Sequence, residues 1–557
     1  MHSIHEMKFR RRFSINPYKT LRMKLGEMSC FKNWVDDRRG DPYPVLESTE
    51  TDEKRMSETL PDARYRAENH TSGPLMKARL LGQHFPYATY DVEMDEVASD
   101  GVSGMGVRIA ASGEEGSDYD RTNEPTLYIL ASVCEGHINI HKTTKVGGGV
   151  QQMETVNTGI AFTPGSRLIV TCRGRFFDVY LRPGNLPEYV CTFEVPEMQY
   201  ILRYDTFVRS TASLLVSAAP GAAVQGAVEF YLEGGVSHAD MKCMHYENGM
   251  PIMKDGRLFM TISVRLQEGG YQMICSWNPS TADIRMEGAL FFDLGDGYWC
   301  SDIASTVVYN RKTDEWYVWA CAFSHGHILC HAVSYADLRY GIHVLDAERM
   351  PVEFYEAPAG EDSLSKTSGG ASESGRPAVS DDRLFFGKAG DEDPDLVYDE
   401  EKGKWQLIFC RNTKDGGETQ YRYYLFESDD PFEGFEFIDR TVKGSNTGGS
   451  IIRVGGEKYL LCGSDFNQRA KYLLHPLNDL SKRTEIRFDY DDGGFRGWGC
   501  LIPVPCGRRT RYVWMTFDRH NGSSYNWSYG NIHVFEADRM NYGWEWHDKP
   551  GLIGRGI

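Results

Sequence analysis

The chain has 557 residues, enough for two or three domains, and its 41% hydrophobic and 25% charged residues are those of an ordinary globular protein. Its formal net charge of −18 argues against nucleic acid or an anionic membrane as the main partner, because phosphate binding requires clustered Lys and Arg. No run of about 18 apolar residues occurs, and no apolar core follows the basic stretch KFRRRFSINPYKTLRMK. We therefore expect neither a membrane span nor a secretory signal.

The 13 cysteines are scattered along the chain without CxxC pairs. In a chain of this length, an odd number of scattered cysteines is typical of reduced, mostly buried thiols and not of a disulfide framework. Reduced thiols persist in the cytosol, so we expect a cytoplasmic protein.

The first part of the chain is predicted to form an arm followed by a sandwich. Residues 1–60 are polar and charged, and we expect an irregular N-terminal arm. Residues 61–228 contain short alternating or β-branched runs such as ATYDVEMDEV, RLIVTCRG and FFDVYLRP, which predict a two-sheet antiparallel β-sandwich. The layout resembles the concanavalin-like jelly roll often attached to carbohydrate enzymes. Its strands show no cluster of exposed aromatics, so we expect it to support its neighbour and not to bind sugar.

Residues 229–557 contain a loose repeat, and ten of the eleven Trp lie after residue 270. Five segments pair an apolar strand with a turn and a second strand: MPIMKDGRLFMTIS, STVVYNRKTDEWYVWACAF, DLVYDEEKGKWQLIFC, SIIRVGGEKYLLCG and IPVPCGRRTRYVWMTF. A repeated four-stranded unit of this kind predicts a β-propeller with five blades. The chain is thus expected to be all-β, with an N-terminal β-sandwich and a C-terminal five-bladed β-propeller.

In a propeller the inner strands of all blades start at one face of the central channel, so residues just before them meet in one funnel. The stretch GDEDPD places Glu392 and Asp393 before the third inner strand, and GYWCSD places Trp299 and Asp302 before the second. The corresponding regions of the first and fifth repeats add His238, Asp240, Glu247, Arg496 and Trp498.

Carboxylates from three blades, together with aromatic planes, suit the cleavage of glycosidic bonds. One acid must be protonated to help the leaving oxygen depart, and another must be ionised to activate water or attack the sugar. Crowding of several acids raises the pKa of one relative to its neighbours and so separates these roles. Trp299 and Trp498 would offer apolar faces to a sugar ring. This constellation favours a glycoside hydrolase.

The last 330 residues or so resemble the five-bladed propeller glycoside hydrolases of families 43 and 117, and more distantly families 32, 68 and 130. WCSD is similar to the Trp-Ala-Pro-Asp that carries an orienting acid in family 43, which implies that role for Asp302. The resemblance implies a base or nucleophile at Asp240, chosen over Glu247, although the usual Asp-Pro-Ser is missing there. The proton donor is Asp393, which has the family's spacing, or Glu392, which has the family's residue type.

Further funnel residues are expected to bind the substrate. SHGHILCH spaces His325, His327 and His331 evenly, on one face of a regular strand, where they could share a zinc ion. We favour sugar hydrogen bonding by His325 and His327, and the resemblance to family 117 would also allow His325 to act as a general acid. The remaining candidates are Asp465, Arg519 and His520.

We expect an exo-acting enzyme on short oligosaccharides, because a cytoplasmic enzyme meets imported fragments and not polymers. No cofactor is expected, although the resemblance allows a structural calcium in the channel. The main rival is a propeller that binds carbohydrate without cutting it. A polysaccharide lyase would need a basic funnel, and a phosphorylase would need several Arg and Lys, where the sequence offers Arg469, Arg496 and Arg519.

Overall fold

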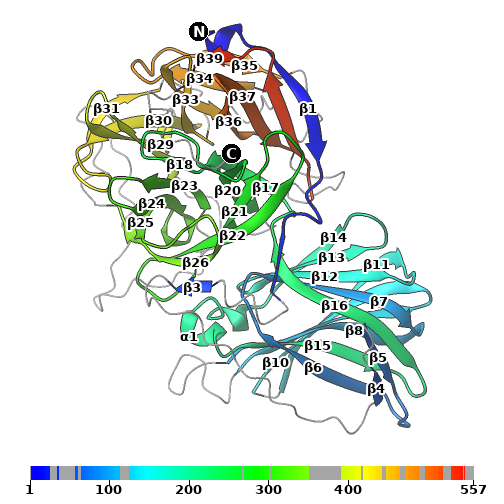
Figure 1. Cartoon of the computed structure of the whole chain (residues 1–557). Helices are drawn as coiled ribbons and strands as arrows, with labels where there is room; N and C mark the ends of the chain where they lie inside the picture. The colour runs from blue at the N-terminus through cyan, green and yellow to red at the C-terminus, as the bar shows by residue number, and fades with distance from the viewer. Residues whose placement is uncertain are drawn as a thin grey trace, which may run out of the picture.

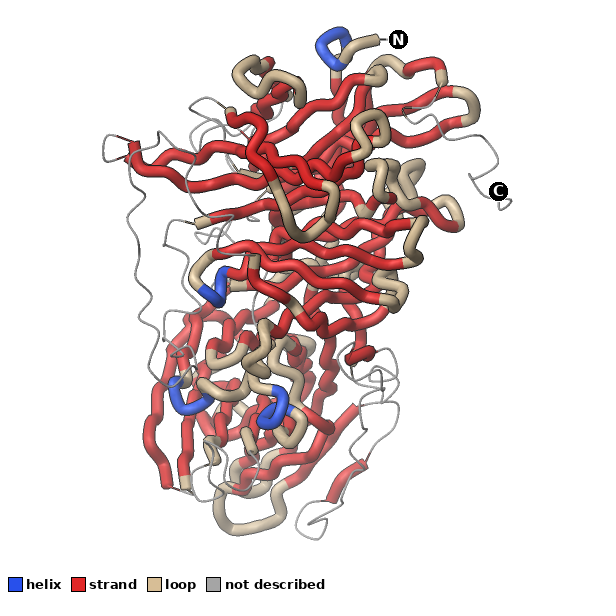
Figure 2. Tube along the Cα trace, turned by 90° about the vertical axis from the view of Figure 1, so that its left-hand side faces the viewer, coloured by secondary structure: helices blue, strands red, loops and turns tan. Residues whose placement is uncertain are grey.

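In the computed structural model, the regular secondary structure of the described residues is almost entirely β-strand (Figures 1 and 2). The all-β prediction is therefore confirmed. Within the described residues no helix is long and apolar enough to cross a membrane. The described residues are 2–25, 34–36, 57–59, 64–112, 124–147, 149–265, 269–299, 303–350, 390–415, 418–441, 447–463, 471–488, 496–518, 529–543 and 545.

Five sheets make up the C-terminal part, and each contributes one inner strand. The inner strands are β17 (His238–Cys243), β23 (Ile303–Asn310), β28 (Asp391–Asp399), β32 (Ser450–Val454) and β36 (Arg496–Cys506). The other strands of the first sheet are β19 (Met253–Lys254), β20 (Arg257–Arg265), β21 (Gly270–Trp277), β22 (Ile284–Asp293), β26 (Gly341–Asp346) and β3 (Trp34–Asp36). The other strands of the second sheet are β18 (His245–Tyr246), β24 (Glu315–Ala322), β25 (Ile328–Ser334) and β27 (Glu348–Arg349). The other three contain β29 (Lys404–Asp415), β30 (Glu418–Ser428) and β31 (Glu436–Arg440); β33 (Glu457–Gly463), β34 (Lys471–Pro476) and β35 (Thr484–Arg487); and β37 (Arg509–Phe517), β38 (Ile532–Ala537), β39 (Asn541–Tyr542) and β1 (Phe9–Ile15).

The five inner strands close into a ring. β17 contacts β23, β23 contacts β28, β28 contacts β32, β32 contacts β36, and β36 returns to β17. This closure makes the five sheets the blades of a propeller around one central channel. Four of the five predicted repeats supply their inner strand as expected. In the first repeat the inner strand lies upstream, in β17, and the predicted segment contributes only the short β19 before β20.

Two antiparallel sheets form the N-terminal part, which lies below the propeller in Figure 1. One has the order β11-β10-β9-β8-β15-β6, and the other has the order β14-β13-β12-β7-β16-β5-β4, with β2 also pairing with β16. Their strands are β2 (Arg22–Lys24), β4 (Ser57–Thr59), β5 (Arg64–Glu68), β6 (Leu75–Gln83), β7 (Ala88–Val97), β8 (Asp100–Ala110), β9 (Thr126–Cys134), β10 (His137–Val146), β11 (Gly149–Ala161), β12 (Ser166–Arg173), β13 (Phe176–Arg182), β14 (Glu188–Glu194), β15 (Thr211–Ala218) and β16 (Ala223–Glu233). The helical turns are η1 (Ile4–Glu6), η3 (Pro196–Met198), α1 (Tyr204–Phe207) and η4 (Phe323–His325).

The first 60 residues are not irregular where the structure describes them. β1 pairs antiparallel with β38 as the outer strand of the fifth blade, and β2 pairs with β16 of the sandwich. The segment therefore belongs to both parts of the molecule (Figure 1). Its sequence hid this role, because an edge strand buries little side-chain area, and β1 accordingly contains no fully buried residue.

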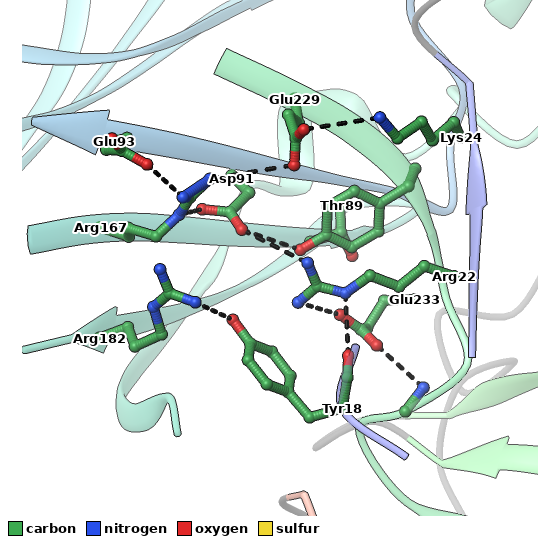
Figure 3. Close-up of polar contacts among 12 residues, drawn as sticks. Tyr18, Arg22, Lys24, Thr89, Asp91, Glu93, Arg167, Arg182, Glu229 and Glu233 are labelled. Carbon is green, nitrogen blue, oxygen red and sulfur yellow. Dashed lines mark hydrogen bonds and ion pairs between the residues drawn. The ribbon is translucent and has the colours of Figure 1, made fainter. Parts of the chain in front are cut away.

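A buried ionic cluster fixes this N-terminal segment to the sandwich (Figure 3). The Arg22 guanidinium lies between the rings of Tyr18 and Tyr231, 4.3 and 4.2 Å from their centroids. Its Nη2 is 3.2 Å from the Glu233 carboxylate, and its Nη1 is 3.7 Å from the Asp91 carboxylate. The side chains of Glu233 and Asp91 are both fully buried. Burial raises the pKa of Glu233 to about 7, although the Arg22 charge opposes this rise. Arg22 thus compensates two carboxylates that have no access to water.

Replacement of Arg22 by Met is expected to lower the free energy of unfolding by about 3 to 5 kcal/mol, because it leaves the buried Glu233 carboxylate without its cation, whereas Asp91 keeps Arg167 at 2.6 Å. Urea unfolding followed by tryptophan fluorescence measures this loss. The matched control is Arg12→Met, since Arg12 is exposed and pairs with Glu536 at 3.1 Å on the same segment. Its loss is expected to be about 1 kcal/mol or less, and equal losses in the two variants would contradict this account of the cluster.

Candidate active site

Each of the first three inner strands contains a bulge near its start. Residues Asp240, Ala304 and Asp393 occupy matching positions in these bulges, with φ values of +47°, +58° and +53°. Such left-handed backbone in a residue other than glycine costs about 1 to 3 kcal/mol and is common at functional sites. A bulge also redirects a side chain beside the sheet. The register shifts lie between Ala239 and Lys242, between Ile303 and Thr306, and between Glu392 and Asp395.

Asp240 and Asp393 are buried and interact electrostatically. Burial raises the pKa of Asp393 well above its ordinary value, and the negative charge of Asp240 raises it further. Burial also raises the pKa of Asp240, but the charge of Arg265 and a hydrogen bond with Ser263 oppose the rise. The first and third blades thus place two carboxyl groups together, and Asp240 has the stronger support for its ionised form.

Glu392 joins this pair from the residue before the third bulge. Its negative charge raises the pKa of both Asp240 and Asp393. Its carboxylate Oε1 lies 3.0 Å from Nε2 of His327, and its side chain is 15% exposed, more than the other two acids. Glu392, Asp240 and Asp393 therefore form one carboxyl cluster, with His327 at its edge. These acids lie in the first residues of β28 and in β17, and not in turns ahead of the strands.

Two cations that the sequence reasoning missed lie in the same cluster. Arg265 is the last residue of β20. Burial lowers its pKa overall, although the negative charges of Asp240, Glu392 and Asp393 raise it. Lys242, buried on β17, donates from Nζ to the carbonyl oxygen of Pro394 at 2.5 Å. Arg265 stands in the strand sequence VRL and Lys242 in DMKC, each as a single cation beside apolar residues. A lone cation in such a strand is a signal for a buried charge. Both cations therefore compensate negative charge within the cluster.

The loop before the fourth inner strand completes the cluster. The Gly448 backbone N–H donates to Oδ2 of Asp393 at 2.6 Å. Gly448 has φ +79°, and a Cβ atom on it would lie 2.6 Å from the Trp498 ring. Only glycine fits this place, which brings Trp498 beside the residue that holds Asp393. Burial raises the pKa of the half-buried Tyr421, and the negative charges of Glu392 and Asp393 raise it further.

Three other predicted site residues serve the structure elsewhere. Trp299 has no exposed surface and packs on Phe207 of the sandwich, with ring centroids 4.3 Å apart, so it cannot stack on a sugar. Glu247 pairs through Oε1 with Nη2 of Arg311 at 2.6 Å. Arg311 directly follows the last residue of β23, at the opposite end of that strand from the bulge. His238 is fully buried and hydrogen-bonded to the Gly234 carbonyl at 2.8 Å, and burial lowers its pKa to about 4.

The three evenly spaced histidines do not share one face, because η4 interrupts the expected strand. His325 lies between the Ser324 hydroxyl at 2.8 Å and the Asp296 carboxylate at 3.0 Å. His331, on β25 of the second blade, packs on the ring of Phe432 between β30 and β31 of the third blade, with ring centroids 4.8 Å apart. His327 alone of the three reaches the carboxyl cluster. In the described part of the chain no three His, Cys, Asp or Glu side chains are grouped to hold a metal ion.

The remaining predicted residues lie where the structure gives no side-chain position. Arg496 is the first residue of β36, and only its backbone is described. Those outside the described residues are Asp302, Asp465, Arg469, Arg519 and His520. Asp302 directly precedes β23, two residues before the bulged Ala304.

No protein-family model matches the chain, and no curated protein matches its sequence. Similar solved structures include a thermostable family-43 glycoside hydrolase, at 11% identity over 56% of this chain and 96% of that one, with a TM-score of 0.34. Another is the inulosucrase from Halalkalicoccus jeotgali bound to kestose (11% identity, 57% and 91% coverage, TM-score 0.38). A third is the catalytic domain of the Coprinopsis cinerea GH62 α-L-arabinofuranosidase, at 13% identity over 55% of this chain and 92% of that one, with a TM-score of 0.32. Likeness at this level carries no argument about activity, and the fold stands on the sheets described above.

Replacement of Asp393 by Asn is expected to stabilise the protein by about 0.5 to 2 kcal/mol at pH 7, and the gain should vanish near pH 4. The folded-state pKa of Asp393 is raised, so its contribution to stability is complete below the unfolded pKa of about 3.9 and is lost as the pH rises. Urea unfolding at both pH values measures the difference.

The matched control for this experiment is Asp399→Asn, at the other end of β28. Partial burial raises the pKa of Asp399, but Lys458, 2.8 Å away, and two backbone hydrogen bonds outweigh this effect and lower that pKa. The stability contributed by Asp399 is therefore present above the unfolded pKa and lost as the pH falls. The Asn variant should be destabilised at pH 7, opposite in sign to Asp393→Asn. The same stability change at pH 4 and pH 7 in Asp393→Asn would contradict the raised pKa.

Proposed function

We propose that this protein is a glycoside hydrolase that removes terminal sugars from short oligosaccharides. The observation that supports it most is the carboxyl cluster, in which Asp240 and Asp393 occupy matching strained bulges of two blades and differ in the support for their ionised forms. Cleavage of a glycosidic bond needs one protonated and one ionised carboxyl group, which is the difference that these environments favour.

In the proposed mechanism Asp393 is the proton donor. Its raised pKa favours the protonated form, which can donate to the leaving glycosidic oxygen. Asp240, assisted by Arg265, is the ionised base or nucleophile. Glu392 is the alternative donor, because it is the most exposed of the three acids and lies 3.0 Å from His327. Asp302 keeps its proposed role as an orienting acid.

The surroundings of the cluster supply the proposed substrate contacts. Trp498 offers the aromatic face that Trp299 cannot, and His327 and Tyr421 offer polar groups at the edge. We keep the proposal of a cytoplasmic enzyme without a cofactor. The eleven cysteines within the described residues are all free thiols, which agrees with a reducing compartment.

The test is hydrolysis of a panel of aryl pentosides, hexosides and deoxyhexosides by the wild type and by Asp240→Asn, Asp393→Asn and Glu392→Gln. Loss of the base or the acid is expected to reduce kcat/KM by about 10²-fold to 10⁴-fold. The donor variant should lose less activity on a 4-nitrophenyl glycoside than on the phenyl glycoside, because a good leaving group needs little protonation. This pattern in Glu392→Gln and not in Asp393→Asn would reassign the donor.

The control variant is Asp399→Asn, which is expected to keep the wild-type rate. Anomer analysis of the first product by NMR then gives the stereochemical outcome, which reports the separation of the two carboxyl groups. If no glycoside is hydrolysed and sugars still bind in calorimetry, with weaker binding in Asp393→Asn, the protein is a carbohydrate-binding propeller and not an enzyme.

A further inference from the structure

Lys242 connects the first and third blades beneath the carboxyl cluster. It lies on β17, two residues after the bulged Asp240, and its side chain is almost completely buried. Its Nζ donates at 2.5 Å to the carbonyl oxygen of Pro394, the residue that directly follows the bulged Asp393. One side chain thus joins the strand of the proposed base to the backbone of the proposed acid.

The segment Asp393–Asp395 is held from other blades as well. The Gly448 N–H donates to Asp393 Oδ2 at 2.6 Å. On the other side, the Thr306 hydroxyl donates to Asp395 Oδ1 at 2.7 Å, and the Ile451 N–H donates to Asp395 Oδ2 at 2.6 Å. The His245 Nε2 atom also lies 3.4 Å from Asp395 Oδ1. Of the groups that hold this segment, Lys242 is the one that comes from the same strand as Asp240. Strained backbone such as that of Asp393 persists only where its surroundings impose it.

The charge of Lys242 also acts on three carboxyl groups. It lowers the pKa of Asp240, Asp393 and Asp395, in each case against the larger effect of burial. Arg265 compensates Asp240 and the two acids of the third bulge, and the His245 imidazole acts with Lys242 to lower the pKa of Asp395. A buried cation within reach of three carboxyl groups reduces their mutual repulsion and favours their ionised forms.

We propose that Lys242 is a positioning residue of the active site, whose ammonium group holds the bulge of Asp393 through the Pro394 carbonyl and sets the protonation of the two catalytic acids. Its effect on catalysis rests on the proposed glycosidase activity, whereas its effect on the acids does not.

The kinetic test compares the pH dependence of kcat/KM in the wild type, Lys242→Met, Lys242→Gln and Lys242→Arg. Loss of the cation is expected to move both limbs of the profile to higher pH by about 1 unit, because the pKa values of both acids rise. Lys242→Gln, which keeps a donor for Pro394, should show the same shift, and Lys242→Arg should restore the wild-type limbs. A lower rate at every pH with unmoved limbs would show a purely structural role and overturn the proposal.

A second test needs no activity and uses a double-mutant cycle at pH 7. Lys242→Met is expected to lower the folding equilibrium constant by about 10²-fold, and at least about 10-fold less when the ionised Asp240 is already Asn, because less charge is left uncompensated. Lys254→Met, an exposed lysine of the same blade, is the control and should be additive with Asp240→Asn. If Lys242→Met does not fold, Lys242→Gln replaces it in the cycle.

The two tests fail independently. Additive effects of Lys242 and Asp240 in the cycle would overturn the positioning role whatever the activity. A wild-type protein that hydrolyses no glycoside would contradict the proposed function, and the cycle would still decide whether Lys242 governs the acids.

Discussion

The arrangement of the site depends on how the first residues of β28 are pinned at the centre of the ring. The Asp395 carboxylate accepts hydrogen bonds from Thr306 of the second blade and Ile451 of the fourth, while Lys242 of the first blade binds the Pro394 carbonyl. These contacts leave the neighbouring Asp393 in a strained conformation that no isolated strand would adopt. Closure of the five blades is therefore what brings the carboxyl groups together and makes their burial possible.

The sandwich and the N-terminal segment support this ring from outside. Trp299 and the sandwich residue Phe207 lie in one hydrophobic core, and Tyr87 of the sandwich donates to the Trp299 carbonyl at 2.7 Å. The Arg22 cluster holds the N-terminal segment against β16, whose continuation leads into β17 and Asp240. The strand with the proposed base is thus connected to a fixed body at its start, which limits its freedom to move relative to the third blade.

Part of the site could be predicted from sequence because its residues carry local signals. Asp240, Glu392 and Asp393 were found from acids at the starts of strands, and the structure brings all three together. Trp299 carries the same signal, an aromatic residue before an inner strand, yet it is buried against the sandwich. A local pattern reports that a side chain lies near the mouth of a blade, but it cannot report which other domain covers that mouth.

The sequence by itself determined the all-β class, the repeat of five blade units and the acids that begin the third inner strand, because alternation, turn residues and charge are local properties of the chain. Tertiary structure alone decided that β1 completes the fifth blade, that Glu247 pairs with Arg311 away from the cluster, and that Lys242 and Arg265 lie among the acids. These outcomes depend on contacts between residues tens to hundreds of positions apart. Such contacts exist only once the ring has closed, and no short stretch of sequence encodes them.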